Sequence, residues 1–175
     1  MRALVELAHR RRPELLVYSG DMTQRAQRDE FDAARTFCRE LGIARTLTLP
    51  GNHDIPLFDV FQRAFRPYAR YLAAFGPRLE PCLDMDGFLV LGVNTTRPAR
   101  HKNGEVSPAQ VERVARQLHG TRAGQLRIVV THQPARDQAC RAASAPTRRS
   151  CSSSSRSTAA GGCVTTMRSW PARVP

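Results

Sequence analysis

The sequence predicts an α/β fold with a largely buried sheet, and two observations carry this prediction. Up to about residue 136, short apolar runs typical of strands alternate with segments whose apolar residues recur at helical spacing. Hydrophobic residues make up 41% of the 175 residues, which lies in the range of globular proteins. A chain of this length can form one domain with a substantial core.

The first part of the chain contains two predicted strands with a helix between them. The apolar run Leu15–Tyr18 predicts the first strand, and residues 46–49 predict the second. Gly42 is a stop signal for the helix between them. Apolar residues at helical spacing define that helix: Phe31, Ala34, Cys38 and Leu41.

An aromatic stripe follows the second strand. Its members share one face of a predicted helix: Phe58, Phe61, Phe65, Tyr68, Leu72 and Phe75. Pro67 should kink or break that helix, because proline lacks the backbone donor that a helix interior needs. We expect the stripe to belong to the hydrophobic core.

The second part of the chain predicts two more strands and one helix. The run Phe88–Val93 is a buried strand, which we expect to pair with residues 82–85. Ser107, Pro108 and Gln110 form a strong helix start, with serine as the cap and glutamine reaching back to it. A last strand is predicted over residues 126–130.

Residues 137–175 have a different character and form the second of two predicted regions, after a folded domain over residues 1–136. Residues 138–175 contain six arginines but no acidic residue and no leucine. Such a segment cannot bury enough apolar surface to offset its ordering entropy, so we expect it to be disordered. A natural low-complexity tail is one interpretation, and an out-of-frame tail is the one that the absence of leucine favours.

Charge and cysteine content narrow the function classes. The net charge is +12, but 26 of the 27 basic residues are arginine, a skew that a GC-rich coding sequence would give. Nucleic-acid binding is therefore weakly supported. Five cysteines without a C-x-x-C pair indicate a reducing compartment. No run approaches the length of a membrane span and the N-terminus is polar, so we expect a cytoplasmic protein without a membrane partner.

Polar residues follow four of the predicted strands. The strands run into Asp21, into Asn52 and His53, into Asn94, and into His132. Ligands in open α/β sheets bind outside the carboxyl ends of the strands, and these residue types together are typical of a metal site. Each taken singly has a simpler interpretation, as a turn residue, a helix cap or a core histidine.

Three blocks in this order, "SGDMTQRA", "LPGNHD" and "VVTHQP", resemble signature blocks of the calcineurin-like metallophosphoesterase superfamily. The nearer likeness is to its bacterial branch that includes class III cyclic-nucleotide phosphodiesterases, which "GVNTTRPARHKNGEVSPAQ" also resembles. This resemblance implies a four-layer α/β/β/α sandwich, here truncated at both ends. It also implies hydrolysis of a phosphodiester or phosphomonoester, in a small molecule or nucleotide, by a hydroxide that bridges two metal ions.

The resemblance also implies a role for each residue of the site. Asp21 matches the carboxylate that bridges two divalent ions, which are Mn, Fe, Zn or Ni in the family. Asn52 and His132 match ligands of the second ion. His53 matches the histidine near the leaving-group oxygen. Asn94, singled out by its place at a strand end and not by the resemblance, is a candidate contact for the substrate phosphate or for a metal ligand.

Two ligand blocks of the family are absent from this sequence. The D-x-H block that supplies two ligands of the first ion is missing, and so is the final G-H-x-H block. We therefore expect at most one ion to be retained. We interpret the chain as an incomplete copy, with its start assigned late and its frame lost near codon 137. A catalytically inactive remnant and a basic nucleic-acid-binding protein are the alternatives. For Asp54, a structural role as the cap of the next helix is favoured over orienting His53.

Overall fold

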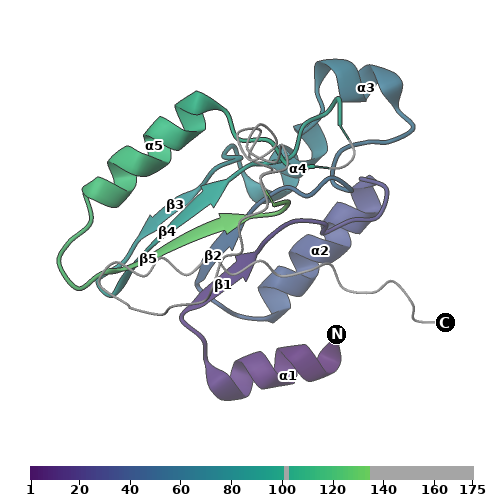
Figure 1. Cartoon of the computed structure of the whole chain (residues 1–175). Helices are drawn as coiled ribbons and strands as arrows, with labels where there is room; N and C mark the ends of the chain where they lie inside the picture. The colour runs from purple at the N-terminus through teal and green to yellow at the C-terminus, as the bar shows by residue number, and fades with distance from the viewer. Residues whose placement is uncertain (101–102, 135–175) are drawn as a thin grey trace, which may run out of the picture.

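The computed structural model describes residues 1–100 and 103–134, and the predictions made for residues 137–175 lie outside this part of the chain. Helices and strands alternate along it (Figure 1). In chain order they are α1 Arg2–Arg11, β1 Leu15–Tyr18, α2 Arg28–Glu40, β2 Arg45–Thr48, α3 Val60–Phe65, α4 Ala69–Phe75, β3 Cys82–Asp84, β4 Phe88–Val93, α5 Pro108–His119 and β5 Leu126–Thr131.

The strands form two small sheets, which confirms the predicted mixed α/β class. In the first sheet β1 and β2 run parallel, with Leu15 opposite Arg45 and Tyr18 opposite Thr48. In the second sheet β4 lies between β3 and β5, antiparallel to β3 and parallel to β5. The expected pairing of residues 82–85 with β4 is therefore confirmed.

One apolar cluster joins the two sheets. Leu47 of β2 and Leu49 just after it pack with Val90 of β4 and Val130 of β5. Fully burying a side chain of this kind contributes roughly 1.5–3 kcal/mol. The helix α5 lies on one side of the strands, while α1 and α2 lie on the other (Figure 1). The outer strands are less covered than predicted, since Val17 of β1 and Leu126 of β5 are exposed.

Local sequence signals set the helix boundaries. Ser107 caps α5 by accepting a hydrogen bond from the backbone of Gln110 at 3.2 Å, and the Gln110 side chain accepts from the Ser107 backbone at 2.8 Å. The predicted break at Pro67 separates α3 from α4. The strand predicted over residues 46–49 begins one residue earlier, at Arg45.

The prediction that the aromatic stripe lies in the core is wrong for its first half. Phe58, Phe61 and Phe65 are 77%, 75% and 72% exposed. The break at Pro67 ends the common helical face, so that α3 stands away from the strands (Figure 1) while α4 packs on α2. The fully buried aromatic is instead Tyr71, whose hydroxyl donates to Oγ1 of Thr48 at 2.9 Å.

No helix within residues 1–100 and 103–134 is long and apolar enough to cross a membrane.

Candidate metal centre

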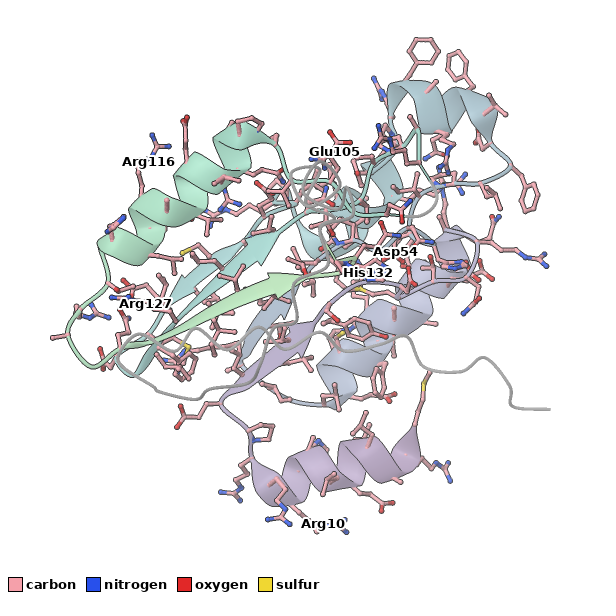
Figure 2. The ribbon with its side chains drawn as sticks, viewed as in Figure 1. Arg10, Asp54, Glu105, Arg116, Arg127 and His132 are labelled. Carbon is pink, nitrogen blue, oxygen red and sulfur yellow. The ribbon has the colours of Figure 1, made fainter. Side chains whose placement is uncertain are left out.

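Three of the predicted ligands meet at the carboxyl ends of the strands. They lie in the loops that follow β1, β2 and β5, at the end where His132 and Asp54 are labelled in Figure 2. Nε2 of His132 lies 3.1 Å from Oδ1 of Asn52 and 3.3 Å from Oδ1 of Asp21. The structure therefore brings Asp21, Asn52 and His132 together, as expected for parallel strands that end at one edge.

The ring of His132 is held by its other nitrogen. Nδ1 lies 2.7 Å from the carbonyl oxygen of Ser19. A carbonyl can only accept, so Nδ1 carries a hydrogen and donates it. In the neutral ring the lone pair of Nε2 then faces the oxygens of Asp21 and Asn52, which are acceptors too. Three electron-rich atoms converge, and this arrangement calls for a cation, either a proton on Nε2 or a metal ion.

The electrostatics of the site agree with this geometry. Burial alone would raise the pKa of Asp21, but the hydrogen bond and charge of His132, with the backbone N–H of His53, lower it below its ordinary value. Burial alone would lower the pKa of His132, but the carboxylate of Asp21 and the carbonyl of Ser19 raise it. Without a metal ion, these partners therefore stabilise a protonated His132 beside an ionised Asp21.

Two glycines allow the loops to approach this closely. A Cβ atom on Gly51 would lie 2.1 Å from both N and Oδ1 of Asp21. A Cβ atom on Gly20, whose φ is +105°, would lie 2.4 Å from Nδ1 of His132. The glycines before Asp21 and Asn52 thus make room for each other's loop and for the histidine ring.

Asp54 has a structural role, but it does not cap the next helix as expected, because the cap of α3 is Asp59. Its carboxylate is buried and accepts hydrogen bonds from the backbone of Gly51 at 2.8 Å, from Thr23 N at 2.9 Å and Thr23 Oγ1 at 2.9 Å, and from Met22 N at 3.3 Å. Burial raises the pKa of this carboxyl, while these donors act in the opposite direction. Asp54 therefore ties the loop after β2 to the loop after β1, on which Asp21 lies.

His53 touches the cluster through its backbone. Its N–H donates to Oδ1 of Asp21 at 3.0 Å. Nδ1 of its exposed ring lies 3.1 Å from the carbonyl oxygen of Gln24, which places the hydrogen of the neutral ring on Nδ1. The carbonyl of Gln24, and not Asp54, orients this ring.

Asn94 is engaged in a turn of its own and forms no hydrogen bond with Asp21, Asn52 or His132 within the described residues. Its Oδ1 accepts from Thr96 N at 3.0 Å and from Thr96 Oγ1 at 2.6 Å. Its backbone carbonyl accepts from the side chain of Gln110 at 2.9 Å. These contacts account for its burial, and a contact with substrate stays a prediction.

Gln133 belongs to the site but was not singled out in the sequence. Its Nε2 donates to Oδ1 of Asn52 at 2.9 Å, which turns the amide oxygen of Asn52 toward His132. Its backbone N–H donates to Oγ1 of Thr95 at 3.0 Å. In the sequence, its position next to His132 was the feature that could have identified it as a residue of the site.

Among residues 1–100 and 103–134, no three His, Cys, Asp or Glu side chains are grouped so that they could hold a metal ion. The cluster instead combines one carboxylate, one imidazole and an amide oxygen. No protein-family model matches the sequence, and a comparison with curated proteins gives no significant match.

Proposed function

We propose that this chain is a metal-dependent phosphoesterase that hydrolyses a phosphodiester or phosphomonoester. The observation that carries the proposal is the convergence of Asp21, Asn52 and His132 at one edge of the strands. The resemblance of the three sequence blocks to calcineurin-like metallophosphoesterases supports it. Helices on both sides of two sheets support the truncated α/β/β/α sandwich that this resemblance implies.

The donor set fits a divalent transition metal ion. Oδ1 of Asp21, Oδ1 of Asn52 and Nε2 of His132 would hold it. Their separations of 3.1 and 3.3 Å are close to the roughly 3 Å expected between neighbouring ligands that each bind an ion at about 2.1 Å. Imidazole and carboxylate together suit Mn, Fe, Zn or Ni. When bound, such an ion polarises a phosphoryl oxygen and lowers the pKa of a water molecule.

The chain's own residues prepare the site before an ion binds. Ser19 fixes the tautomer of His132, so that Nε2 is directed at Asp21 and Asn52. Asp54 holds the two loops in register through its four hydrogen bonds. Because folding alone brings Asp21, Asn52 and His132 together, the binding of an ion would require little rearrangement.

His53 is the residue that we assign to the leaving group. The carbonyl of Gln24 occupies Nδ1, which leaves Nε2 of the exposed ring available to a substrate. In its protonated form Nε2 can donate a hydrogen bond, and then a proton, to the departing oxygen. General acid catalysis of this kind contributes about 10²–10⁴-fold to the rate.

The experiment separates metal binding from catalysis. The chelator-treated protein is titrated with Mn²⁺ by calorimetry, and hydrolysis of bis(p-nitrophenyl) phosphate and p-nitrophenyl phosphate is then followed at saturating Mn²⁺. We expect Asp21→Ala to lose both properties. We expect His53→Ala to keep metal binding while its hydrolysis falls about 10²-fold or more. His119→Ala, on the exposed end of α5, is the matched control and should keep both.

Each outcome has a clear meaning. Saturable Mn²⁺ binding without hydrolysis would assign the chain to the alternative, an inactive remnant of such an enzyme. No Mn²⁺ binding at all would remove the basis of the proposal. Hydrolysis that survives Asp21→Ala would show that the activity arises elsewhere.

A further inference from the structure

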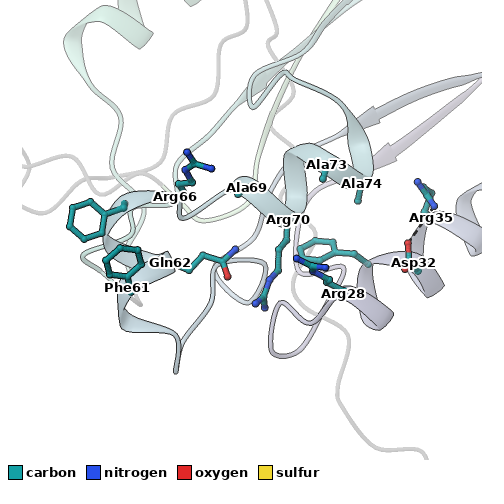
Figure 3. A pocket seen from close by; sticks show the side chains of 12 residues that line it. Arg28, Asp32, Arg35, Phe61, Gln62, Arg66, Ala69, Arg70, Ala73 and Ala74 are labelled. Carbon is teal, nitrogen blue, oxygen red and sulfur yellow. Dashed lines mark hydrogen bonds and ion pairs between the residues drawn. The ribbon is translucent and has the colours of Figure 1, made fainter.

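A groove of about 590 Å³ lies between α2 on one side and α3 and α4 on the other (Figure 3). Its polar and aromatic lining includes Arg28, Arg35, Arg66, Arg70, Phe61 and Phe65. None of Asp21, Asn52 and His132 lines it. The groove is therefore separate from the candidate metal centre.

The groove has an excess of positive charge. Arg35 is paired with Asp32 at 3.3 Å, and Arg70 lies 3.7 Å from Asp59. Arg28 and Arg66 form no ion pair within the part of the chain that the structure describes, and both are exposed. Two guanidinium groups are thus left to a ligand, and guanidinium groups are well suited to bind phosphate oxygens.

Two exposed aromatic rings lie beside these arginines. The ring centroids of Phe61 and Phe65 are 4.7 Å apart on one face of α3. Pro67 separates this face from α4 and from the core, so the rings gain little from folding and remain in solvent. Exposed aromatic residues grouped beside a groove are typical of a binding surface.

The lining residues form a row, with Phe61 at one end and Arg35 at the other (Figure 3). This open and elongated shape suits a chain better than a compact ligand. A second copy of the protein would bring the same arginines against each other, so that charge opposes a symmetric contact through this groove. A duplex would keep its bases stacked and unavailable to the phenylalanine rings.

We propose that the groove binds single-stranded nucleic acid. Arg28 and Arg66 would contact successive phosphates, and Phe61 would stack on an unpaired base. The sequence places Arg66 beside Phe65, but Arg28 of α2 is more than thirty residues away along the chain and joins them only in the fold.

The experiment measures binding of a fluorescein-labelled thymidine strand of about 12 nucleotides to the full chain by anisotropy at several salt concentrations. The double variant Arg28→Ala/Arg66→Ala should reduce the slope of log K against log salt by about 1.4. Phe61→Ala should raise the Kd about fivefold or more without changing that slope. All three side chains are exposed, so the variants should fold normally.

A charge-matched control separates the groove from the net charge of the chain. Arg10→Ala/Arg116→Ala removes two arginines from α1 and α5 (labelled in Figure 2), neither of which lines the groove, and should leave the affinity nearly unchanged. An equal loss in this control would overturn the proposal. So would normal binding by Phe61→Ala, or free thymidine monophosphate that competes as well per nucleotide as the strand does.

Discussion

His132 and Ser19 are 113 residues apart in the chain, yet Nδ1 of the histidine lies 2.7 Å from the carbonyl oxygen of the serine. This contact joins the end of β5 to the end of β1. It also determines which ring nitrogen faces Asp21, because Nδ1 is occupied by the carbonyl. The fold thus orients the one imidazole of the cluster before any ion is bound.

The first prediction concerns the contribution of His132 to metal affinity. We expect His132→Ala to weaken Mn²⁺ binding about 10–100-fold or more, because it removes one of the three proposed ligands that folding brings together. Calorimetric titration of the chelator-treated protein measures the affinity. His9→Ala is the control, since the exposed His9 bonds to the carbonyl of Glu40 and to no residue of the cluster within the described part of the chain. Equal affinities for the two variants would show that His132 is not a ligand.

The second prediction concerns the pH dependence of stability in the metal-free protein. Folding raises the pKa of His132. Its contribution to the free energy of unfolding is therefore complete below pH 6.5, the ordinary pKa of histidine, and is lost as the pH rises through the higher folded pKa. Folding lowers the pKa of Asp21. Its contribution to the free energy of unfolding is therefore complete above pH 3.8, the ordinary pKa of aspartate, and is lost as the pH falls through the lower folded pKa. Both contributions are present together between pH 3.8 and pH 6.5.

Urea unfolding of the wild type and of His132→Gln, with chelator present, measures this effect. The difference in unfolding free energy should be largest inside that pH window and should shrink on both sides of it. The buried Asp54 is present in both proteins, and its charge is a further cause of the raised pKa of His132. A difference that keeps growing as the pH rises above 6.5 would contradict an ion pair between His132 and Asp21.

The third prediction concerns the contact between the loops after β1 and β2. Gly51→Ala should destabilise the protein by about 1–3 kcal/mol, because the new methyl group would lie 2.1 Å from the backbone nitrogen of Asp21. It should also weaken metal binding, since Asp21 must move. Gly87→Ala is the matched control, because nothing lies within 4 Å of a Cβ atom there. Thermal unfolding of both variants measures their stability. A Gly51→Ala protein as stable as the control would show that the loop of Gly51 does not approach Asp21 this closely.

The features that could be predicted from the sequence are those set by neighbouring residues. The capping box of Ser107 and Gln110 and the break at Pro67 act over a few residues, and both appear where they were expected. The strand ends were found by the same local signals. The meeting of Asp21, Asn52 and His132 then followed from the rule that parallel strands present their carboxyl ends at one edge.

The features that could not be predicted depend on contacts between distant segments. The exposure of Phe61 and Phe65 follows from the direction that the chain takes after Pro67, which no periodicity reveals. The bond from Gln133 to Asn52 spans 81 residues, and that from Thr23 to Asp54 spans 31. Helical or strand spacing carries no information about such pairs, so their roles become visible only in the folded chain.

The last prediction concerns Asp54 as the link between the two ligand loops. Asp54→Ala would leave the buried donors of Gly51 and Thr23 without their carboxylate acceptor, and each buried donor left unsatisfied costs about 1–3 kcal/mol. We expect the unfolding free energy to fall by about 3 kcal/mol or more. Asp86→Ala is the control at an exposed aspartate and should change it by less than about 0.5 kcal/mol.

The same variant also tests whether this link supports the metal centre. If Asp54 positions Asn52 and Asp21 through their loops, Asp54→Ala should weaken Mn²⁺ binding even under conditions in which the variant is fully folded, as judged by circular dichroism. Asp54 forms no hydrogen bond with His132 or with the ring of His53 within the described residues, but its charge acts on His132, so a loss can pass through the loop backbone and through this charge. A folded Asp54→Ala protein with wild-type Mn²⁺ affinity would limit Asp54 to stability alone.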